Sequence, residues 1–194
     1  LIQPFSFRRP YILYVSRIDH PVKNHVKLIE AFSIFKERTR YPHRLVLAGA
    51  DSKNANRVKK AAARSKYRND IFFTGHFSLK NLPELYAGSE MVVFPSKYEG
   101  FGMGVLEAMA CGTPCVVTNV GDASLIAGET GWVVPPGDSR ALADALQKAM
   151  EEKQNRPDVW ERRKVAARAR IVENFSLEAM VERFHSVWQD ALDL

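Results

Sequence analysis

Short apolar runs alternate along the chain with longer segments in which apolar residues recur every three or four positions or alanine is abundant. The short runs are typical of buried strands and lie at 11–15, 45–48, 71–73, 91–94, 115–118 and 132–134. The longer segments predict helices at 24–38, 55–66, 78–88, 105–110, 140–152, 159–174 and 177–192. Strands that are apolar throughout need helices over both faces of their sheet. The alternation therefore predicts an α/β fold with a doubly wound, mostly parallel sheet.

Several helix starts are marked by residues whose side-chain oxygens can accept from free N–H groups. Ser78, Ser176 and either Asp138 or Ser139 stand directly before helical segments. We therefore expect helices to begin at these residues.

The chain is expected to form one domain. Its 194 residues can bury a full core, and neither an internal repeat nor a low-complexity linker divides it. We expect a core at about 11–152, followed by extra C-terminal helices at about 157–194 that follow no strand. The start, Leu1-Ile-Gln-Pro4, carries neither an initiator methionine nor a signal-peptide pattern, so we expect a portion of a longer protein.

The net charge of +6 suits anionic partners such as phosphorylated ligands, nucleic acid or acidic lipid. Much of the basic charge lies at 53–68 and 156–170, where solvated helix faces are the ordinary explanation. Neither stretch is interleaved with the aromatic side chains that single-strand binders use, so nucleic acid is not expected. No apolar run approaches the roughly 20 residues of a membrane-spanning helix. The two cysteines, Cys111 and Cys115, fit reduced core thiols of a cytosolic protein better than a redox pair or a zinc site.

The segment Glu99-Gly-Phe-Gly-Met-Gly-Val-Leu-Glu107 follows one predicted strand and leads into a predicted helix. Its glycines let backbone N–H groups approach a phosphate, and its two carboxylates can accept hydrogen bonds from sugar hydroxyls. Open α/β sheets bind their ligands at such strand-to-helix turns. The glycine spacing is not that of a dinucleotide fold, and no G-x-x-x-x-G-K-[ST] phosphate loop occurs, which argues against dehydrogenases and ATPases. A structural role for Glu107, in a cap or a core salt bridge, stays open.

Two cations follow the first predicted strand, at Arg17 and Lys23. A guanidinium and an ammonium together can neutralise a diphosphate. A single loop cation is usually solvated. Two in one strand-to-helix loop, on the sheet edge that also carries the glycine turn, favour an anion site.

These motifs together resemble the C-terminal, nucleotide-sugar-binding domain of retaining glycosyltransferases of family 4, the glycosyl transferases group 1, which have the GT-B fold. The segment 99–114 is similar to the E-x7-E signature of that family and the helix that follows it. The likeness covers most of residues 11–152 in the same order. It also includes segments 14–18, 23–25, 47–49, 73–75, 93–96 and 128–137.

The resemblance implies catalytic roles for three residues. Arg17 and Lys23 would hold the diphosphate of the donor and neutralise it as the leaving group. Glu99 would contact hydroxyls of the donor sugar and help to fix the anomeric carbon. The loop from Arg17 to Lys23 is one residue longer than the commonest family form.

The resemblance also implies substrate-binding positions. Backbone N–H groups of Met103 and Gly104, next to Gly102, would meet phosphate oxygens. Glu107 would bind the ribose diol, and the backbone of Phe77 would touch the base. The sequence around Phe77 does not identify the base, so GDP-mannose and UDP-hexoses both remain candidate donors.

As implied by the resemblance, no metal or other cofactor is expected, and no Asp-x-Asp pair precedes a sugar site. The acceptor, a glycan or a lipid-linked sugar, would bind to an N-terminal domain that this chain lacks. The final helix would cross back onto that domain and would leave Phe184 or Trp188 exposed here. The protein would be cytoplasmic, with peripheral association to the cytoplasmic face of a membrane left open. Two alternatives remain, a sugar-nucleotide epimerase of the same fold and a non-catalytic nucleotide-binding module.

Overall fold

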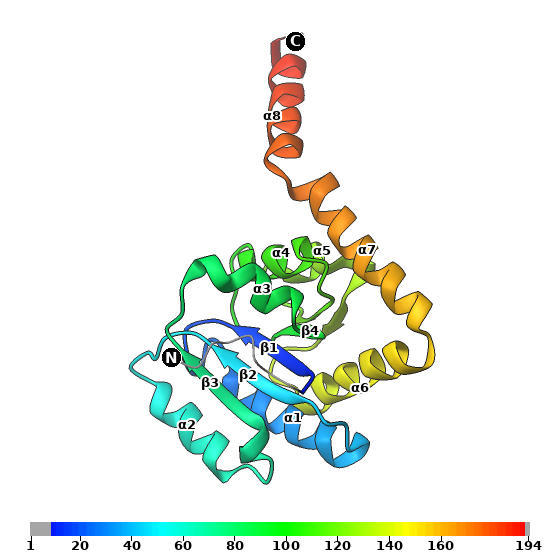
Figure 1. The fold of residues 1–194 in the computed structure, drawn as a ribbon. Helices are drawn as coiled ribbons and strands as arrows, with labels where there is room; N and C mark the ends of the chain where they lie inside the picture. The colour runs from blue at the N-terminus through cyan, green and yellow to red at the C-terminus, as the bar shows by residue number, and fades with distance from the viewer. Residues whose placement is uncertain (1–8, 193–194) are drawn as a thin grey trace.

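The computed structural model describes residues 9–192, which contain one six-stranded sheet with helices on both faces (Figure 1). The strand order is β3-β2-β1-β4-β5-β6, and every neighbouring pair is parallel. The strands are β1 (Tyr11–Val15), β2 (Arg44–Ala48), β3 (Ile71–Gly75), β4 (Met91–Phe94), β5 (Cys115–Thr118) and β6 (Trp132–Val134). The prediction of a doubly wound sheet is confirmed, and its strands are wholly rather than mostly parallel.

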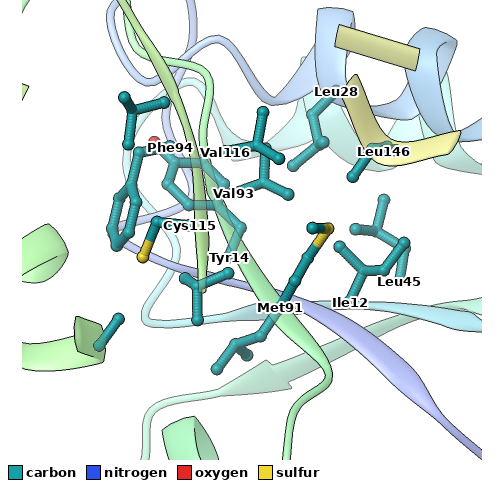
Figure 2. Packing of buried hydrophobic residues seen from close by; sticks show 14 of the residues in the cluster. Ile12, Tyr14, Leu28, Leu45, Met91, Val93, Phe94, Cys115, Val116 and Leu146 are labelled. Atoms are coloured by element: carbon teal, nitrogen blue, oxygen red, sulfur yellow. The ribbon is translucent and has the colours of Figure 1, made fainter. Parts of the chain in front are cut away.

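The helices divide between the two faces of the sheet because parallel strands need crossover connections. On one face lie α1 (His25–Thr39), α2 (Ala55–Arg64) and α6 (Ser139–Asn155), and on the other lie α3 (Leu82–Ala87), α4 (Met103–Ala110) and α5 (Ala123–Ala127) (Figure 1). The strands between these layers are almost entirely buried. Figure 2 shows Ile12, Met91 and Val116 of three strands packed near Leu28 of α1 and Leu146 of α6.

The centre of the sheet is the point where the chain changes direction. β1 lies between β2 and β4. The chain leaves β1 toward α1 on one face, whereas it leaves β4 toward α4 on the opposite face (Figure 1). The two connections therefore separate at the carboxyl ends of β1 and β4. Such a switch point is where open α/β sheets form a ligand crevice.

Three local features differ from the sequence-based expectation or refine it. The predicted helix at 78–88 is a 3₁₀ turn (Leu79–Asn81) followed by the short α3, whose first turn contains Pro83. Ser78 caps the 3₁₀ turn rather than an α-helix. α5 was not predicted, because five residues are too few to show a helical period. The caps at Asp138 and Ser176 are confirmed, with side-chain oxygens accepting from the N–H groups of Arg140 and Ala141 and of Ala179, respectively.

Of the last two helices, only the final one extends away from the rest of the domain (Figure 1). α7 (Pro157–Phe175) packs against α4 and α6, whereas α8 (Leu177–Leu192) contains no buried side chain. Phe184 and Trp188 of α8 are 60% and 70% exposed. This is the exposure expected for a helix whose apolar face packs outside this chain. Positions 193–194 of the predicted C-terminal segment lie outside the described residues.

The two cysteines are free thiols. Cys115 is buried in β5, where burial raises the pKa of its thiol well above the ordinary value. Cys111 is half-buried at the end of α4. None of the helices in residues 9–192 is long and apolar enough to cross a bilayer.

Candidate functional site

A cavity of about 330 Å³ lies at the switch point of the sheet. Three segments line it: the end of β1 with the loop that follows, the loop after β4, and the first turn of α4. The lining residues are Tyr14, Val15, Ser16, Lys23, Phe94, Glu99, Gly100, Phe101, Gly102, Met103, Gly104 and Val105. Residues that are about 80 positions apart in sequence thus meet at one edge of the sheet.

The loop after β1 is held by hydrogen bonds within its own turn. The ring of His25 is buried, with Nδ1 2.8 Å from the carbonyl oxygen of Asp19 and Nε2 3.2 Å from Oγ of Ser16. Burial lowers the pKa of His25 to about 4, so the ring is neutral at pH 7. A neutral ring can donate from Nδ1 to a carbonyl and accept at Nε2. His25 therefore ties the start of α1 to the middle of this loop.

Gly49, after β2, supports the same loop from the other side. A Cβ built on Gly49 would lie 2.0 Å from the carbonyl oxygen of Ser16, and the residue has φ +146°. Only glycine allows the two backbones to approach this closely. The loop that carries Arg17 and Lys23 is therefore packed against the β2–α2 connection.

The loops after β1 and β4 are also hydrogen bonded to each other. Nδ2 of Asn24 donates to the carbonyl of Pro95 over 3.0 Å, and the N–H of Lys97 donates to the carbonyl of Val22 over 2.8 Å. These bonds fix the distance between the loop that carries Lys23 and the loop that carries Glu99. The separation of Lys23 and Glu99 is consequently set by backbone as well as by side chains.

An ion pair joins the two loops inside the cavity. Nζ of Lys23 lies 2.7 Å from Oε1 of Glu99, and their side chains are 26% and 18% exposed. Oγ of Ser96 donates to the same Oε1 over 2.6 Å. The OH of Tyr14 donates to the carbonyl of Lys23 over 2.9 Å and lies 3.2 Å from Oγ of Ser96. A neutral hydroxyl therefore holds each member of the pair, through the carboxylate of Glu99 and through the backbone carbonyl of Lys23.

The first turn of α4 offers free backbone donors to the same cavity. Gly102 precedes the helix with φ 90°, and a Cβ on Gly104 would lie 2.7 Å from the ring of Phe94. The N–H groups at the start of a helix have no intrahelical acceptor, and the helix dipole makes this end positive. The N–H groups of Met103 and Gly104 are thus suited to an anion, in particular a phosphate.

Comparison with known sequences identifies the family. The sequence profile described as glycosyl transferases group 1 matches residues 3–170. The chain belongs to this family. The match confirms the resemblance that the glutamate and cation motifs indicate.

Two relatives and one solved structure show how much of a longer protein the chain matches. It is 32% identical over 142 residues to the O-antigen chain mannosyltransferase B of Escherichia coli, covering 73% of this chain and 37% of the relative. It is 30% identical over 184 residues to the alpha-D-kanosaminyltransferase of Streptomyces kanamyceticus, covering 94% of this chain and 46% of the relative. The structure of a glycosyltransferase from Rickettsia africae has a TM-score of 0.82 and 27% identity, over 95% of this chain and 48% of the other. The chain therefore spans less than half the length of each of these three proteins.

Not all of the residues expected from the sequence lie in this cavity. Lys23, Glu99 and the residues 102–104 line it, whereas three others do not. Arg17 is exposed in the same loop as Lys23. Phe77 is half-buried and packs against the core after β3.

Glu107 is the third expected residue outside the cavity. It is exposed on α4, and its Oε2 accepts a hydrogen bond from the OH of Tyr86 over 3.1 Å. Burial and the neighbouring Glu107 charge raise the pKa of Tyr86, so the phenol remains a donor. The carboxylate is neither a helix cap nor part of a core salt bridge.

Two residues that line or support the cavity were not expected from the sequence. Tyr14 reads as one more apolar residue of β1, and Ser96 lies in a motif to which the sequence assigns no role. The sequence feature that could have indicated them is a hydroxyl residue near the carboxyl end of a buried strand. Within residues 9–192, no group of three or more His, Cys, Asp and Glu side chains is arranged to hold a metal ion.

Proposed function

We propose that this chain is the donor-binding domain of a retaining glycosyltransferase that moves a hexose from a nucleoside-diphosphate sugar to a glycan or a lipid-linked acceptor. Family membership supports the reaction class. The observation that carries the proposal is the meeting of Lys23, Glu99 and the glycine-bounded start of α4 around one cavity at the switch point. This site offers cationic and N–H donors for a diphosphate next to a carboxylate for sugar hydroxyls.

The chemistry assigned to the site follows from charge. Cleavage of the bond between the anomeric carbon and the diphosphate leaves negative charge on the departing oxygen, which preorganised donors and cations stabilise. In this proposal Lys23, Arg17 and the N–H groups of Met103 and Gly104 supply that stabilisation. A divalent metal is then not required.

The remaining parts of the donor are assigned to the neighbouring residues. Glu99 accepts hydrogen bonds from the sugar hydroxyls once a phosphate has taken its place beside Lys23. Glu107 and the backbone of Phe77 bind the ribose and the base, outside the cavity that holds the diphosphate. Retention of configuration by front-face attack is the stereochemistry that the family resemblance implies.

The acceptor is assigned to a part of the protein outside this chain. The chain spans less than half of its group 1 relatives. The apolar side of α8 also remains uncovered, including Val181, Phe184 and Trp188. We assign that side to contact with an N-terminal acceptor-binding domain. This chain alone should then bind donor without transferring sugar efficiently.

Peripheral association with an anionic membrane on its cytoplasmic face is the second part of the proposal. Arg57, Lys60 and Arg64 lie on one face of α2 and are all exposed. With Val26 and Ala61 they line a hollow of about 380 Å³ that no carboxylate lines. Each Lys or Arg near the surface of an anionic bilayer contributes about 1 kcal/mol to the free energy of membrane binding.

Two basic residues of α7 provide a contrast, because each has a partner within the fold. Arg163 pairs with Glu152, and Arg170 donates to the carbonyl of Ile126. Both side chains are therefore bound within the domain, unlike the exposed cations of α2. Sedimentation with phosphatidylcholine vesicles, with and without phosphatidylglycerol, tests the α2 face. Binding only to anionic vesicles, lost when Arg57, Lys60 and Arg64 are all changed to Gln, is expected. Equal sedimentation of the triple variant would remove the assignment.

The function itself is tested by competition between ligands. UDP, GDP and ADP should each be compared with UDP-glucose, GDP-mannose and ADP-glucose, and with the free nucleosides. We expect one base to be preferred, the diphosphate to be required, and the attached sugar to add affinity. Equal binding of a free diphosphate and its sugar form would instead indicate a non-catalytic nucleotide-binding module. The named relatives are transferases and offer no support for an epimerase.

A further inference from the structure

Three buried hydroxyl side chains lie in a row beneath the Lys23–Glu99 ion pair. Tyr14 comes from β1, Ser96 lies just after β4 beyond Pro95, and Thr118 ends β5; these three strands are neighbours in the sheet. All three residues are buried, and Figure 2 shows Tyr14 among apolar side chains of the core. Hydroxyls in such surroundings cost free energy unless they are hydrogen bonded. Their partners therefore indicate what they do.

The partners of Tyr14 and Ser96 are the two charged residues of the site. Ser96 has one hydroxyl hydrogen, which Oε1 of Glu99 accepts over 2.6 Å. The hydrogen of Tyr14 then lies between the carbonyl of Lys23, at 2.9 Å, and Oγ of Ser96, at 3.2 Å. Burial raises the pKa of Tyr14, so the phenol stays a donor at neutral pH.

Thr118 extends the row to the next strand. Its Oγ1 lies 2.7 Å from the carbonyl oxygen of Ser96 and 3.2 Å from that of Phe94. It thus holds the backbone where the chain leaves β4 for the glutamate loop. The three hydroxyls connect the sheet itself to the two loops that carry Lys23 and Glu99.

We propose that Tyr14 and Ser96 are positioning residues of the donor site: Tyr14 fixes the backbone of Lys23 for the diphosphate, and Ser96 fixes the carboxylate of Glu99 for the sugar. The inference rests on the proposed donor-binding function. When a phosphate draws the ammonium of Lys23 away from Glu99, the carboxylate loses its cationic partner. Ser96 remains as the donor that holds its orientation.

This division of labour predicts two different binding defects. Tyr14→Phe loosens the diphosphate-binding loop and should weaken UDP and UDP-glucose, GDP and GDP-mannose, or ADP and ADP-glucose by the same factor, about tenfold. Ser96→Ala frees the carboxylate of Glu99 but leaves Tyr14 its hydrogen bond to the carbonyl of Lys23. It should remove most of the added affinity of the sugar-loaded form, about tenfold, and leave the free diphosphate within about twofold.

The chain supplies a matched control for each substitution at the amino ends of the same two strands. Tyr11 begins β1 and donates from a buried OH to the carbonyl of Leu85 over 2.8 Å. Ser89 precedes β4 and donates to the carbonyl of Tyr86 over 2.8 Å. Tyr11→Phe and Ser89→Ala also remove one buried hydroxyl each, but far from the ion pair. They should lower the Tm as the site variants do and leave all affinities unchanged.

Calorimetric titration of the wild-type chain and the four variants with the six nucleotides named above tests the proposal. The expected result is an equal loss for both ligand forms in Tyr14→Phe, a loss confined to the sugar-loaded form in Ser96→Ala, and wild-type affinities in both controls. If Lys23→Ala weakens binding while Tyr14→Phe and Ser96→Ala match their controls, the positioning role is overturned and the donor site stands. If the folded wild-type chain binds none of the six, the proposed function and this role fall together.

Discussion

Nζ of Lys23 and Oε1 of Glu99 lie 2.7 Å apart although the two residues are separated by 76 positions in sequence. Partly exposed ion pairs add little stability, typically about 0–1 kcal/mol. We therefore interpret the pair as two ligand-binding groups that are bound to each other until a ligand separates them. A phosphate can replace the carboxylate beside Lys23, which releases Glu99 for hydroxyl groups.

Removal of the Lys23 ammonium should weaken binding of the diphosphate group but not of the nucleoside. Lys23→Ala is expected to weaken diphosphate binding by about 10–100-fold, the scale of a hydrogen bond to a charged group, and to leave nucleoside binding unchanged. Arg17→Ala should act in the same direction. Titration of each variant with a nucleoside diphosphate and its nucleoside measures the difference. Lys27→Ala, which removes an exposed lysine paired with Glu30 on α1, is the control. Equal losses for both ligands would remove the assigned role.

Glu107→Gln should weaken nucleotide binding by about 1–3 kcal/mol, because the amide no longer offers a charged acceptor to the ribose diol. Tyr86→Phe separates this effect from loss of the Tyr86–Glu107 hydrogen bond, since it removes the bond but keeps the carboxylate. Affinities for the ribonucleotide and its 2′-deoxy form report the contact directly. A Glu107→Gln chain with wild-type affinity would refute the ribose assignment.

Acid should destabilise the fold through His25. Its pKa falls from an ordinary value of 6.5 to about 4 in the folded chain because the ring is buried. Between these values the unfolded chain binds a proton that the folded chain does not, so stability is complete above pH 6.5 and is lost as the pH falls toward 4. The full effect is about 3 kcal/mol.

Urea unfolding of the wild type and of His25→Gln from pH 7 to pH 4 measures this effect. His25→Gln should be less stable at pH 7 and should show a weaker dependence on pH. His185→Gln, which changes an exposed histidine of α8, should retain the wild-type dependence. A pH dependence that is unchanged in His25→Gln would contradict the assignment.

Gly49 should be irreplaceable because its backbone lies so close to the loop that carries Arg17 and Lys23. In Gly49→Ala the new Cβ would lie 2.0 Å from the carbonyl oxygen of Ser16, and we expect a loss of stability of about 3 kcal/mol or more. Gly137→Ala is the control, since Gly137 also has positive φ but no atom within 4 Å of its Cβ position. Backbone strain alone should cost it about 1–2 kcal/mol. Thermal unfolding that ranks the two variants equally would show that the close contact is relaxed at little cost.

Truncation of two tryptophans should change stability by very different amounts. Trp188 is 70% exposed on α8, so Trp188→Ala should change the stability of this chain by less than about 0.5 kcal/mol. Trp160 is buried on α7, stacked on Trp132 with ring centroids 6.2 Å apart, and Trp160→Ala should cost about 3–5 kcal/mol. A large loss in Trp188→Ala, measured by denaturant unfolding, would mean that α8 folds back onto this chain.

The sequence was sufficient for most of the fold because each layer has its own local signal. The strand runs at 91–94 and 115–118 are apolar throughout, and the longer helices show their period or their caps. α5 has five residues and no such signal, and Pro83 divides a predicted helix whose pattern looks continuous. Segments of this kind depend on tertiary packing rather than on local pattern.

The candidate site was predictable only in part for a physical reason. Lys23, Glu99 and the glycine turn belong to motifs, so the sequence indicates them. Their ion pair depends on the strand order, which places β1 next to β4. Buried hydroxyls such as those of Tyr14 and Ser96 acquire a role only when that order is known.

The central claim is that the switch point of this sheet binds a nucleoside diphosphate through Lys23 and the start of α4. Calorimetric titration of the folded chain with UDP, GDP and ADP tests it most directly. The account predicts measurable binding of at least one nucleotide, and its loss by about 10–100-fold in Lys23→Ala. Absence of binding by all three, in a chain whose circular dichroism shows the native fold, would contradict it.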